Sequence, residues 1–510
     1  MFALVNLPEV VKGALFARYS RSPKSVRRLF LDEFAAGQED ALGEGASDVG
    51  VERAERLYER VFLEYGDDSV AQLGGVHLAC EQASQLLAKV LERGRLGAYL
   101  EQSTRYVPYD DRPGGRWRYV VPDEVSLRPE LAAPYQETLD HAFETYARWL
   151  GPLQDLFRDL LPRDPSDPES VYRLTIRAKA CDALRGMLPA ATRSNVGIFA
   201  TAQSYEQLLL RMRGHPLSEV RKYGDLMLIE LRKVIPAFLT RVDRPARGGA
   251  WTDYLQRTRE DTAAVARDLL QGSKPDLSEE VTLTDFDPDG EVKVVAAALY
   301  AGTDLPDARL LDEAKQLTEE QRAAVLRAYV GNRTNRRHKP GRAFERTSYR
   351  FDVLCDYGAF RDLQRHRLLT MEWQRLSPIH GFEVPPEVEA AGGTSDWNDV
   401  MEHSASLYRD MLAAGLEDAA QYAVSMAYRI RFVMDMNARE AMHMIELRST
   451  PQGHPVYRRV CQRMHRLIAD VAGHRAIAAA MSYADHSSGD LGRLEAERRT
   501  EARRRAPDPA

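Results

Sequence analysis

The sequence predicts an α+β protein in which helices outnumber strands. Most long segments place apolar residues three and four positions apart, as amphipathic helices do. Only a few short segments alternate apolar and polar residues, which is the pattern of half-buried strands. A chain of 510 residues is also too long for one ordinary domain, so we expect more than one hydrophobic core.

Periodicity assigns the individual elements. Helical spacing predicts helices within residues 81–100, 204–214, 225–239, 401–430 and 438–448. Alternation of β-branched or aromatic residues with polar ones predicts strands within residues 118–125, 291–300 and 346–354.

Composition excludes several classes of protein. The net charge of −6 gives no general attraction to nucleic acid or to an anionic membrane, so neither is an expected partner. No apolar run approaches the roughly 18 residues that a membrane span needs. The first residues lack a basic segment and include Glu9, so we expect no signal peptide and a cytoplasmic protein. The four cysteines lie far apart without CxxC spacing, which predicts neither disulfides nor a metal site.

Three pairs of similar segments occur in the same order in the two halves of the chain. VKGALFARYSRS at 11–22 matches VKVVAAALYAGT at 292–303, and RGRLGAYLEQSTRY from Arg93 matches RHRLLTMEWQRLSP from Arg365. The tripeptide GHP occurs at 214–216, directly after Arg213, and again at 453–455, shortly after Arg448. Repetition at this scale indicates internal duplication. We therefore predict domains at 1–245 and 280–485, a linker at 246–279, and a disordered charged tail at 486–510.

The cluster Arg365, His366 and Arg367 is the strongest candidate for binding chemistry. Planar guanidinium groups beside an imidazole suit a phosphate or an electron-rich ring. Helical spacing cannot place all three side chains on one face of a helix, so the cluster would contact at least two ligand groups or two walls of a site. The flanking cations predict a lowered pKa for His366. The alternative is a solvated basic turn.

These residues carry a resemblance to the flavin-dependent thymidylate synthases, whose signature is RHRxxSxNExSxRY. The second half keeps its start, RHR, but has Trp373, Arg375 and Ser377 where Glu, Ser and Arg are expected. The first half starts with RGR and keeps the signature's end intact in Glu101, Ser103, Arg105 and Tyr106. The resemblance implies two tandem domains of this family, each a small, mostly antiparallel sheet with long helices.

The resemblance also implies roles for individual residues. Substrate binding falls to Glu101, Ser103, Arg105, Arg185 and Arg213, and cofactor binding falls to Ser69, Arg365, His366, Arg367, Asn437, Arg439 and His443. Arg448 is the expected catalytic residue, since it matches the arginine that polarises the pyrimidine. Because each half has lost what the other keeps, we predict composite sites to which both halves contribute.

The implied reaction is the reductive methylation of dUMP to dTMP. FAD would be the cofactor, NADPH and methylenetetrahydrofolate the co-substrates, and a homodimer of duplicated chains would reproduce the family's tetramer. One alternative is a catalytically degenerate flavin- or nucleotide-binding relative, or a flavoenzyme acting on another pyrimidine nucleotide. The reason for this alternative is the family segment GHxSxxEH. At residues 66–73 of this chain both histidines and the glutamate of that segment are replaced, whereas the second half keeps the glutamate as Glu345. A nucleic-acid-binding role for the basic run at 332–342 is a further alternative, although the run lacks interleaved aromatic residues.

Overall fold

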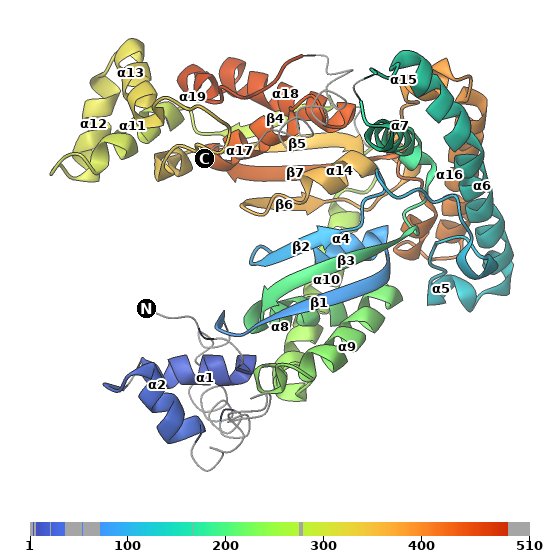
Figure 1. The fold of residues 1–510 in the computed structure, drawn as a ribbon, viewed down its shortest axis with the longest axis horizontal. Coiled ribbons are helices and arrows are strands. Elements are labelled where there is room, and N and C mark those ends of the chain that lie inside the picture. Colours follow the sequence, from blue (N-terminus) through green and yellow to red (C-terminus); the bar gives the residue numbers. More distant parts are fainter. Residues whose placement is uncertain are drawn as a thin grey trace. The chain divides into compact units, whose positions relative to one another are not determined.

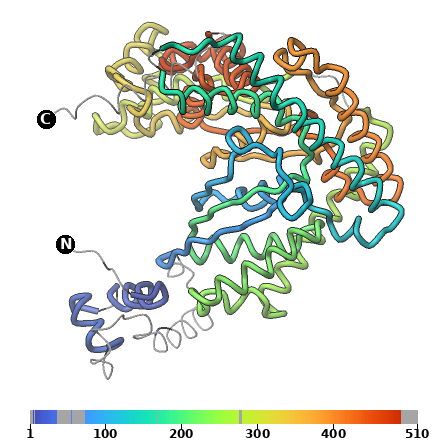
Figure 2. Tube along the Cα trace, turned by 45° about the vertical axis from the view of Figure 1, so that its right-hand side comes forward, coloured from blue at the N-terminus to red at the C-terminus, as the bar shows by residue number. Residues whose placement is uncertain are grey.

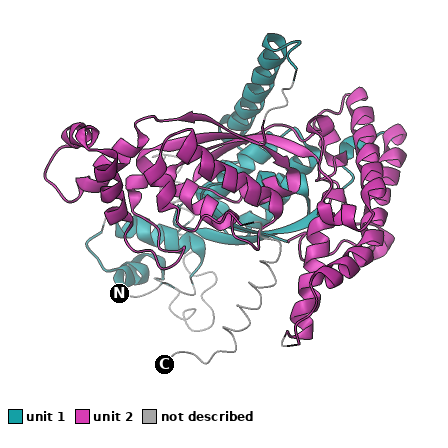
Figure 3. Cartoon of the chain, turned by 90° about the horizontal axis from the view of Figure 1, so that it is seen from above, with its two compact units in different colours: residues 1–102, 120–128, 193–275 teal, residues 103–119, 129–192, 276–510 magenta. Residues whose placement is uncertain are grey.

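The computed structural model describes residue 4 and residues 7–20, 22–35, 54, 72–165, 167–274 and 279–487. The chain forms two compact units, and both are discontinuous in sequence (Figure 3). Unit 1 comprises residues 1–102, 120–128 and 193–275, and unit 2 comprises residues 103–119, 129–192 and 276–510. Unit 2 therefore contains two segments that come from the first half of the sequence. The domain limits that the internal repeats predicted, 1–245 and 280–485, stay a prediction.

Unit 1 is built on a three-stranded antiparallel sheet in the order β1-β3-β2 (Figure 1). Its strands are β1 (Gly75–Ser84), β2 (Gly97–Glu101) and β3 (Arg193–Thr201). Its helices are α1 (Glu9–Tyr19), α2 (Val26–Leu29), α4 (Gln85–Leu91), α5 (Asp123–Ser126), α8 (Ala202–Arg213), α9 (Ser218–Arg232) and α10 (Ala250–Leu269). Helix α10 lies within the stretch that the sequence predicted to be a linker.

Unit 2 is built on a four-stranded antiparallel sheet in the order β4-β5-β7-β6. Its strands are β4 (Val281–Phe286), β5 (Ser348–Asp356), β6 (Leu369–Trp373) and β7 (Arg429–Asn437). Burial alternates along the whole of β7, as expected for a strand with one face on a core. Its helices are α6 (Pro129–Leu160), α7 (Glu169–Leu184), α11 (Gly290–Tyr300), α12 (Asp307–Gln316), α13 (Glu319–Val330), α14 (Tyr357–Leu363), α15 (Pro386–Ala390), α16 (Thr394–Ala413), α17 (Ala438–Arg448), α18 (Pro455–Asp470) and α19 (Arg475–Ala480).

The two units repeat one pattern of elements. The series β1, α4, β2, β3, α8, α9 in unit 1 recurs as β5, α14, β6, β7, α17, α18 in unit 2. The two GHP tripeptides also fold alike, because the imidazole Nδ1 atoms of His215 and His454 accept hydrogen bonds from the backbone two residues later. The helix-rich α+β fold with two tandem antiparallel domains is thus confirmed.

Two long helices of unit 2 come from different halves of the sequence and pack together. Helix α6 lies against α16, as the chain trace also shows (Figure 2). No helix in the described part of the chain is long and apolar enough to span a membrane.

Four of the predicted elements are wrong in whole or in part. The helix predicted within residues 401–430 ends with α16 at Ala413, because Gly415 adopts a positive φ and terminates it, and residues 429–430 already belong to β7. Residues 118–125 contain only a bridge at Tyr119 and the short helix α5, because Pro122 interrupts the run. Residues 291–300 form helix α11, since three consecutive alanines favour a helix over a strand. Residues 81–100 are divided among β1, α4 and β2, because a short apolar run does not distinguish a helix from a buried strand. In contrast, the helix predicted at 438–448 coincides with α17.

Candidate functional site

Six of the seven arginines that the sequence assigned to the site lie in unit 2, and four of them belong to one network. Arg105 follows β2 in the chain, Arg185 follows α7, Arg365 follows α14, and Arg448 ends α17. The first two come from the first half of the sequence and the other two from the second half. One compact unit therefore contains the arginines that the composite-site hypothesis drew from both halves.

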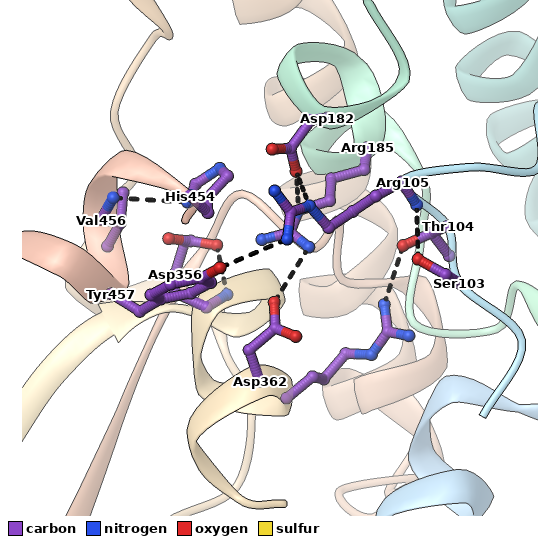
Figure 4. A network of polar contacts seen from close by, with 12 residues as sticks. Ser103, Thr104, Arg105, Asp182, Arg185, Asp356, Asp362, His454, Val456 and Tyr457 are labelled. Atoms are coloured by element: carbon purple, nitrogen blue, oxygen red, sulfur yellow. Dashed lines mark hydrogen bonds and ion pairs between the residues drawn. The ribbon is translucent and has the colours of Figure 1, made fainter. Parts of the chain in front are cut away.

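Two largely buried carboxylates join these arginines, and Figure 4 shows both of them beside Arg105 and Arg185. Asp182 on α7 lies 2.9 Å from Nε of Arg105 and 3.5 Å from Nε of Arg185. Asp362 on α14 lies 3.4 Å from Arg185, 3.4 Å from Arg365 and 4.0 Å from Arg448. These contacts form one continuous network across unit 2.

The aspartates remain ionised despite their burial. Burial alone would raise the pKa of Asp362, but Arg185 and Arg365 outweigh it and hold the pKa well below its ordinary value. Burial acts in the same direction on Asp182, and Arg105 leads the opposing effect, so the pKa of Asp182 is also lowered. The network therefore carries four positive and two negative charges.

Tyr457 contacts two of these arginines. Nη1 of Arg105 donates a hydrogen bond of 3.3 Å to the Tyr457 hydroxyl. The guanidinium of Arg448 lies 5.6 Å from the centre of the Tyr457 ring, which is a cation–π distance. The phenol thus fixes the direction of both side chains.

His366 positions Arg448. Nε of Arg448 donates a hydrogen bond of 3.0 Å to Nε2 of His366, so the proton of the neutral imidazole is on Nδ1. Nδ1 lies 3.0 Å from Oε1 of Glu440, whose second oxygen lies 3.3 Å from Nδ1 of His443. Both ring nitrogens of His366 are therefore engaged within unit 2.

The pKa values of this cluster follow from burial and hydrogen bonding. Burial lowers the pKa of His366 to about 4, with Arg448 adding to the effect and Glu440 opposing it. The sequence predicted the direction but attributed it to Arg365 and Arg367, which is wrong because burial is the main cause. Burial alone would raise the pKa of Glu440, but hydrogen bonds from the imidazoles lower it to about 2.

A cavity of about 570 Å³ opens beside the arginine network. Its walls include Arg105 and Arg185 and the apolar side chains of Phe157 and Trp397. Nε and Nη2 of the buried Arg185 have no hydrogen-bond partner within the described chain. Asp356 also lines the cavity, and burial raises its pKa to about 6. Arg185 thus has donors available for a ligand in this cavity.

The other predicted residues of unit 2 have varied surroundings. Oγ of Ser103 accepts a hydrogen bond from the backbone nitrogen of Arg105, and the side chain of Asn437 caps α17. Arg439 donates to the carbonyl of Pro340, and Arg367 is exposed.

Two predicted substrate residues belong to unit 1. Glu101 is buried against Lys89 at 3.1 Å. Arg213 lies 3.6 Å from Asp225 and donates to the carbonyl of Val242. Ser69 lies outside the described residues. The roles assigned to these residues stay predictions.

Sequence reasoning missed Asp182, Asp362 and Glu440. A local signal existed for the first two, because each precedes a predicted arginine by three positions, a spacing that brings side chains together at a helix end. Glu440 has the same spacing to His443.

The residues around α17 suit an anionic cofactor by the chemistry of their donors. Arg365, Arg439 and His443 are each about one-third exposed, and the carboxylate of Glu440 is buried behind them. Guanidinium and imidazole donors of this kind bind the pyrophosphate of a dinucleotide well. The donor set therefore fits a group such as a flavin dinucleotide.

Comparison with known proteins agrees with the two-copy architecture. The family model described as thymidylate synthase complementing protein matches residues 14–237 and 282–473. A protein of Chlamydia muridarum named "UPF0159 protein" is 39% identical over 98% of this chain and 95% of its own length.

More distant similarities cover parts of the chain. A flavin-dependent thymidylate synthase of Mycobacterium tuberculosis is 28% identical over 35% of this chain and 66% of its own length. Among solved structures, the UMP/dUMP methylase PolB of Streptomyces cacaoi, bound with 5-Br dUMP, has 19% identity and a TM-score of 0.30. That similarity covers 39% of this chain and 94% of the methylase.

Proposed function

We propose, from the premise that this chain belongs to the thymidylate synthase complementing protein family, that it methylates the uracil ring of dUMP. The arginine network of unit 2 is the observation that carries the proposal. Four arginines face Asp182 and Asp362, and positive charge remains in excess even when Asp356, which lines the cavity, is ionised. A phosphate monoester has a charge of about −1.5 to −2 at neutral pH and would balance that excess.

Arg105 and Arg185 are the proposed phosphate ligands. Both line the cavity, and Arg185 has two guanidinium nitrogens without a hydrogen-bond partner in the described chain. Two arginines can contact a phosphate through bidentate hydrogen bonds, which are the strongest available contacts. A bound phosphate would provide the acceptors that these nitrogens lack.

Arg448 is the proposed catalytic residue. Its guanidinium is oriented by His366 and Tyr457, so its charge is fixed before a substrate arrives. A fixed cation at the edge of the uracil ring would stabilise the negative charge that develops as carbon 5 becomes nucleophilic.

A cysteine nucleophile is not needed in this proposal. All four cysteines are buried, and burial raises the pKa of Cys461 to about 12. Such a thiol is not ionised at neutral pH and would be a weak nucleophile. This supports activation of the ring by Arg448 alone.

The proposed cofactor is FAD, which would supply the hydride. Arg365, Arg367, Arg439 and His443 would hold it, and Asn437 would keep α17 in place through its cap. His366 would act indirectly, because both of its ring nitrogens are already bonded. NADPH as reductant, methylenetetrahydrofolate as carbon donor, a homodimer and a cytoplasmic location complete the proposal.

A second candidate is a binding protein that has lost turnover. It is favoured by the contacts of Asp182 and Asp362, because these carboxylates occupy the arginines that a phosphate would need. A nucleotide must then compete with two internal anions.

Complementation of a thymidine-requiring bacterial strain tests the proposal. Growth without thymidine is the expected result, and it should be lost in an Arg448→Gln variant that still folds. If the wild-type chain fails to support growth while the purified protein contains a flavin, as judged by absorbance, the second candidate is favoured. If it neither supports growth nor binds a flavin or dUMP, both candidates are wrong.

A further inference from the structure

The antiparallel helices α6 and α16 of unit 2 are held in a defined register. Nε1 of Trp149 on α6 donates a hydrogen bond of 2.7 Å to Asp396 on α16, and Arg148 lies 2.9 Å from the same carboxylate. Two turns towards the start of α6, His141 lies opposite His403. The two imidazole rings are 5.0 Å apart between centres.

A carboxylate lies between these two imidazoles. Nε2 of His141 is 2.7 Å from Oδ2 of Asp399. Nδ1 of His403 is 2.8 Å from the backbone carbonyl oxygen of Asp399 and 3.5 Å from its Oδ1. Asp399 and His403 are four positions apart on α16, so they share one face of the helix. One potential ligand atom from each residue lies within 4.8 Å of the others.

We propose that His141, Asp399 and His403 bind a divalent transition-metal ion of the Zn²⁺ type, which joins α6 to α16. Imidazole nitrogens suit zinc, nickel and copper, whereas magnesium and calcium prefer oxygen ligands. Bonds to zinc are about 2.0 to 2.2 Å long, which places the ligand atoms of a tetrahedral site about 3.4 Å apart. Nε2 of His141 and Oδ2 of Asp399, now 2.7 Å apart, must therefore separate slightly to admit an ion. Three protein ligands leave a coordination position for water.

The described residues contain one other group of histidine and carboxylate side chains close enough to hold a metal ion, and that group is more deeply buried. In that second group, His366, Glu440 and His443, Arg448 already occupies Nε2 of His366. In the proposed site the side chains are 37%, 50% and 53% exposed, so an ion can reach them from solvent. The same exposure predicts reversible binding.

The ion would stiffen the wall of the cavity. Trp397 lines the cavity and is two positions from Asp399 on α16. Phe157 and Leu160 line the cavity from α6. A bond that joins these helices therefore restrains both apolar walls.

The simpler alternative is that His141 and Asp399 form a hydrogen bond and that no metal ion binds.

The test is a calorimetric titration in which ZnCl₂ is added to the full-length chain after treatment with a chelator. We expect one equivalent of zinc at this site, and a melting temperature that rises with zinc concentration. His141→Ala and His403→Ala should each weaken this binding at least tenfold, because each removes one ligand. These side chains are exposed, so circular dichroism should show that both variants remain folded.

Two control variants lie outside the site. Glu402→Ala removes an exposed carboxylate next to His403, and His380→Ala removes an imidazole of unit 2. Both should bind zinc as the wild type does. Absence of zinc binding in the wild type would overturn the proposal. So would an unchanged stoichiometry and affinity in both His141→Ala and His403→Ala.

Discussion

Substitution of Arg185 by glutamine would test whether the arginine network stabilises unit 2. The side chain is 5% exposed and lies between Asp182 and Asp362. Removing one partner of a buried ion pair costs about 3 to 5 kcal/mol. Asp362 keeps Arg365 and Arg448 as partners, so we expect the lower end of that range, about 3 kcal/mol at pH 7.

The loss should depend on pH with a defined sign. The pKa of Asp362 is far below its ordinary value, so its ion pairs stabilise the folded state above about pH 4. That stabilisation disappears as the pH falls towards the folded-state pKa. The difference in unfolding free energy between the wild type and Arg185→Gln should therefore be largest near pH 7 and shrink below about pH 4.

Urea unfolding followed by tryptophan fluorescence can measure this difference. Trp251 is the one tryptophan of unit 1, whereas the other four lie in unit 2, so the signal reports mainly on the unit that contains Arg185. Arg148→Gln is the matched control, because Arg148 pairs with Asp396 at the surface and such pairs contribute about 0 to 1 kcal/mol. If Arg185→Gln costs no more than Arg148→Gln at pH 7, the network does not stabilise unit 2.

Three further predictions concern stability. Burial raises the pKa of Asp356 to about 6, so its ionisation should cost about 2 kcal/mol of unfolding free energy as the pH rises from 4 to 7; Asp356→Asn should abolish that slope in urea unfolding. Gly186→Ala should lower the melting temperature, because its methyl group would lie 2.8 Å from Trp397, whereas Gly151→Ala in helix α6 meets no atom within 4 Å and should raise it. Lys89→Met should cost about 3 kcal/mol in urea unfolding, because it removes the cation that lies against the buried carboxylates of Glu92 and Glu101, and a cost near zero would contradict this.

Sequence reasoning predicted the fold class because periodicity survives in isolated segments. The spacing at 438–448 predicted α17, and the alternation near 346–354 predicted β5. It could not predict which segments assemble into one unit. Residues 103–119 and 129–192 belong to unit 2, although they precede β3 of unit 1 in the chain. The assignment of these two segments to unit 2 depends on tertiary packing, which no local sequence pattern encodes.

The candidate site was only partly predictable for the same reason. Motif resemblance selected Arg105, Arg185 and Arg448, which the structure places in one unit. It gave no indication that Asp182 and Asp362 would join them, because an acidic residue near a helix end is usually solvated. The pairing of His141 with residues of α16 was also invisible, since it requires the register of two helices far apart in sequence.

Calorimetric titration of dUMP into the wild type, Arg105→Gln, Arg448→Gln and the double variant tests the composite site most directly. Arg105 comes from the first half of the sequence and Arg448 from the second half. If both contact one nucleotide, each single variant should weaken binding at least tenfold, and the double variant should be weaker than the wild type by less than the product of the two effects. Wild-type affinity in either single variant would contradict the composite site.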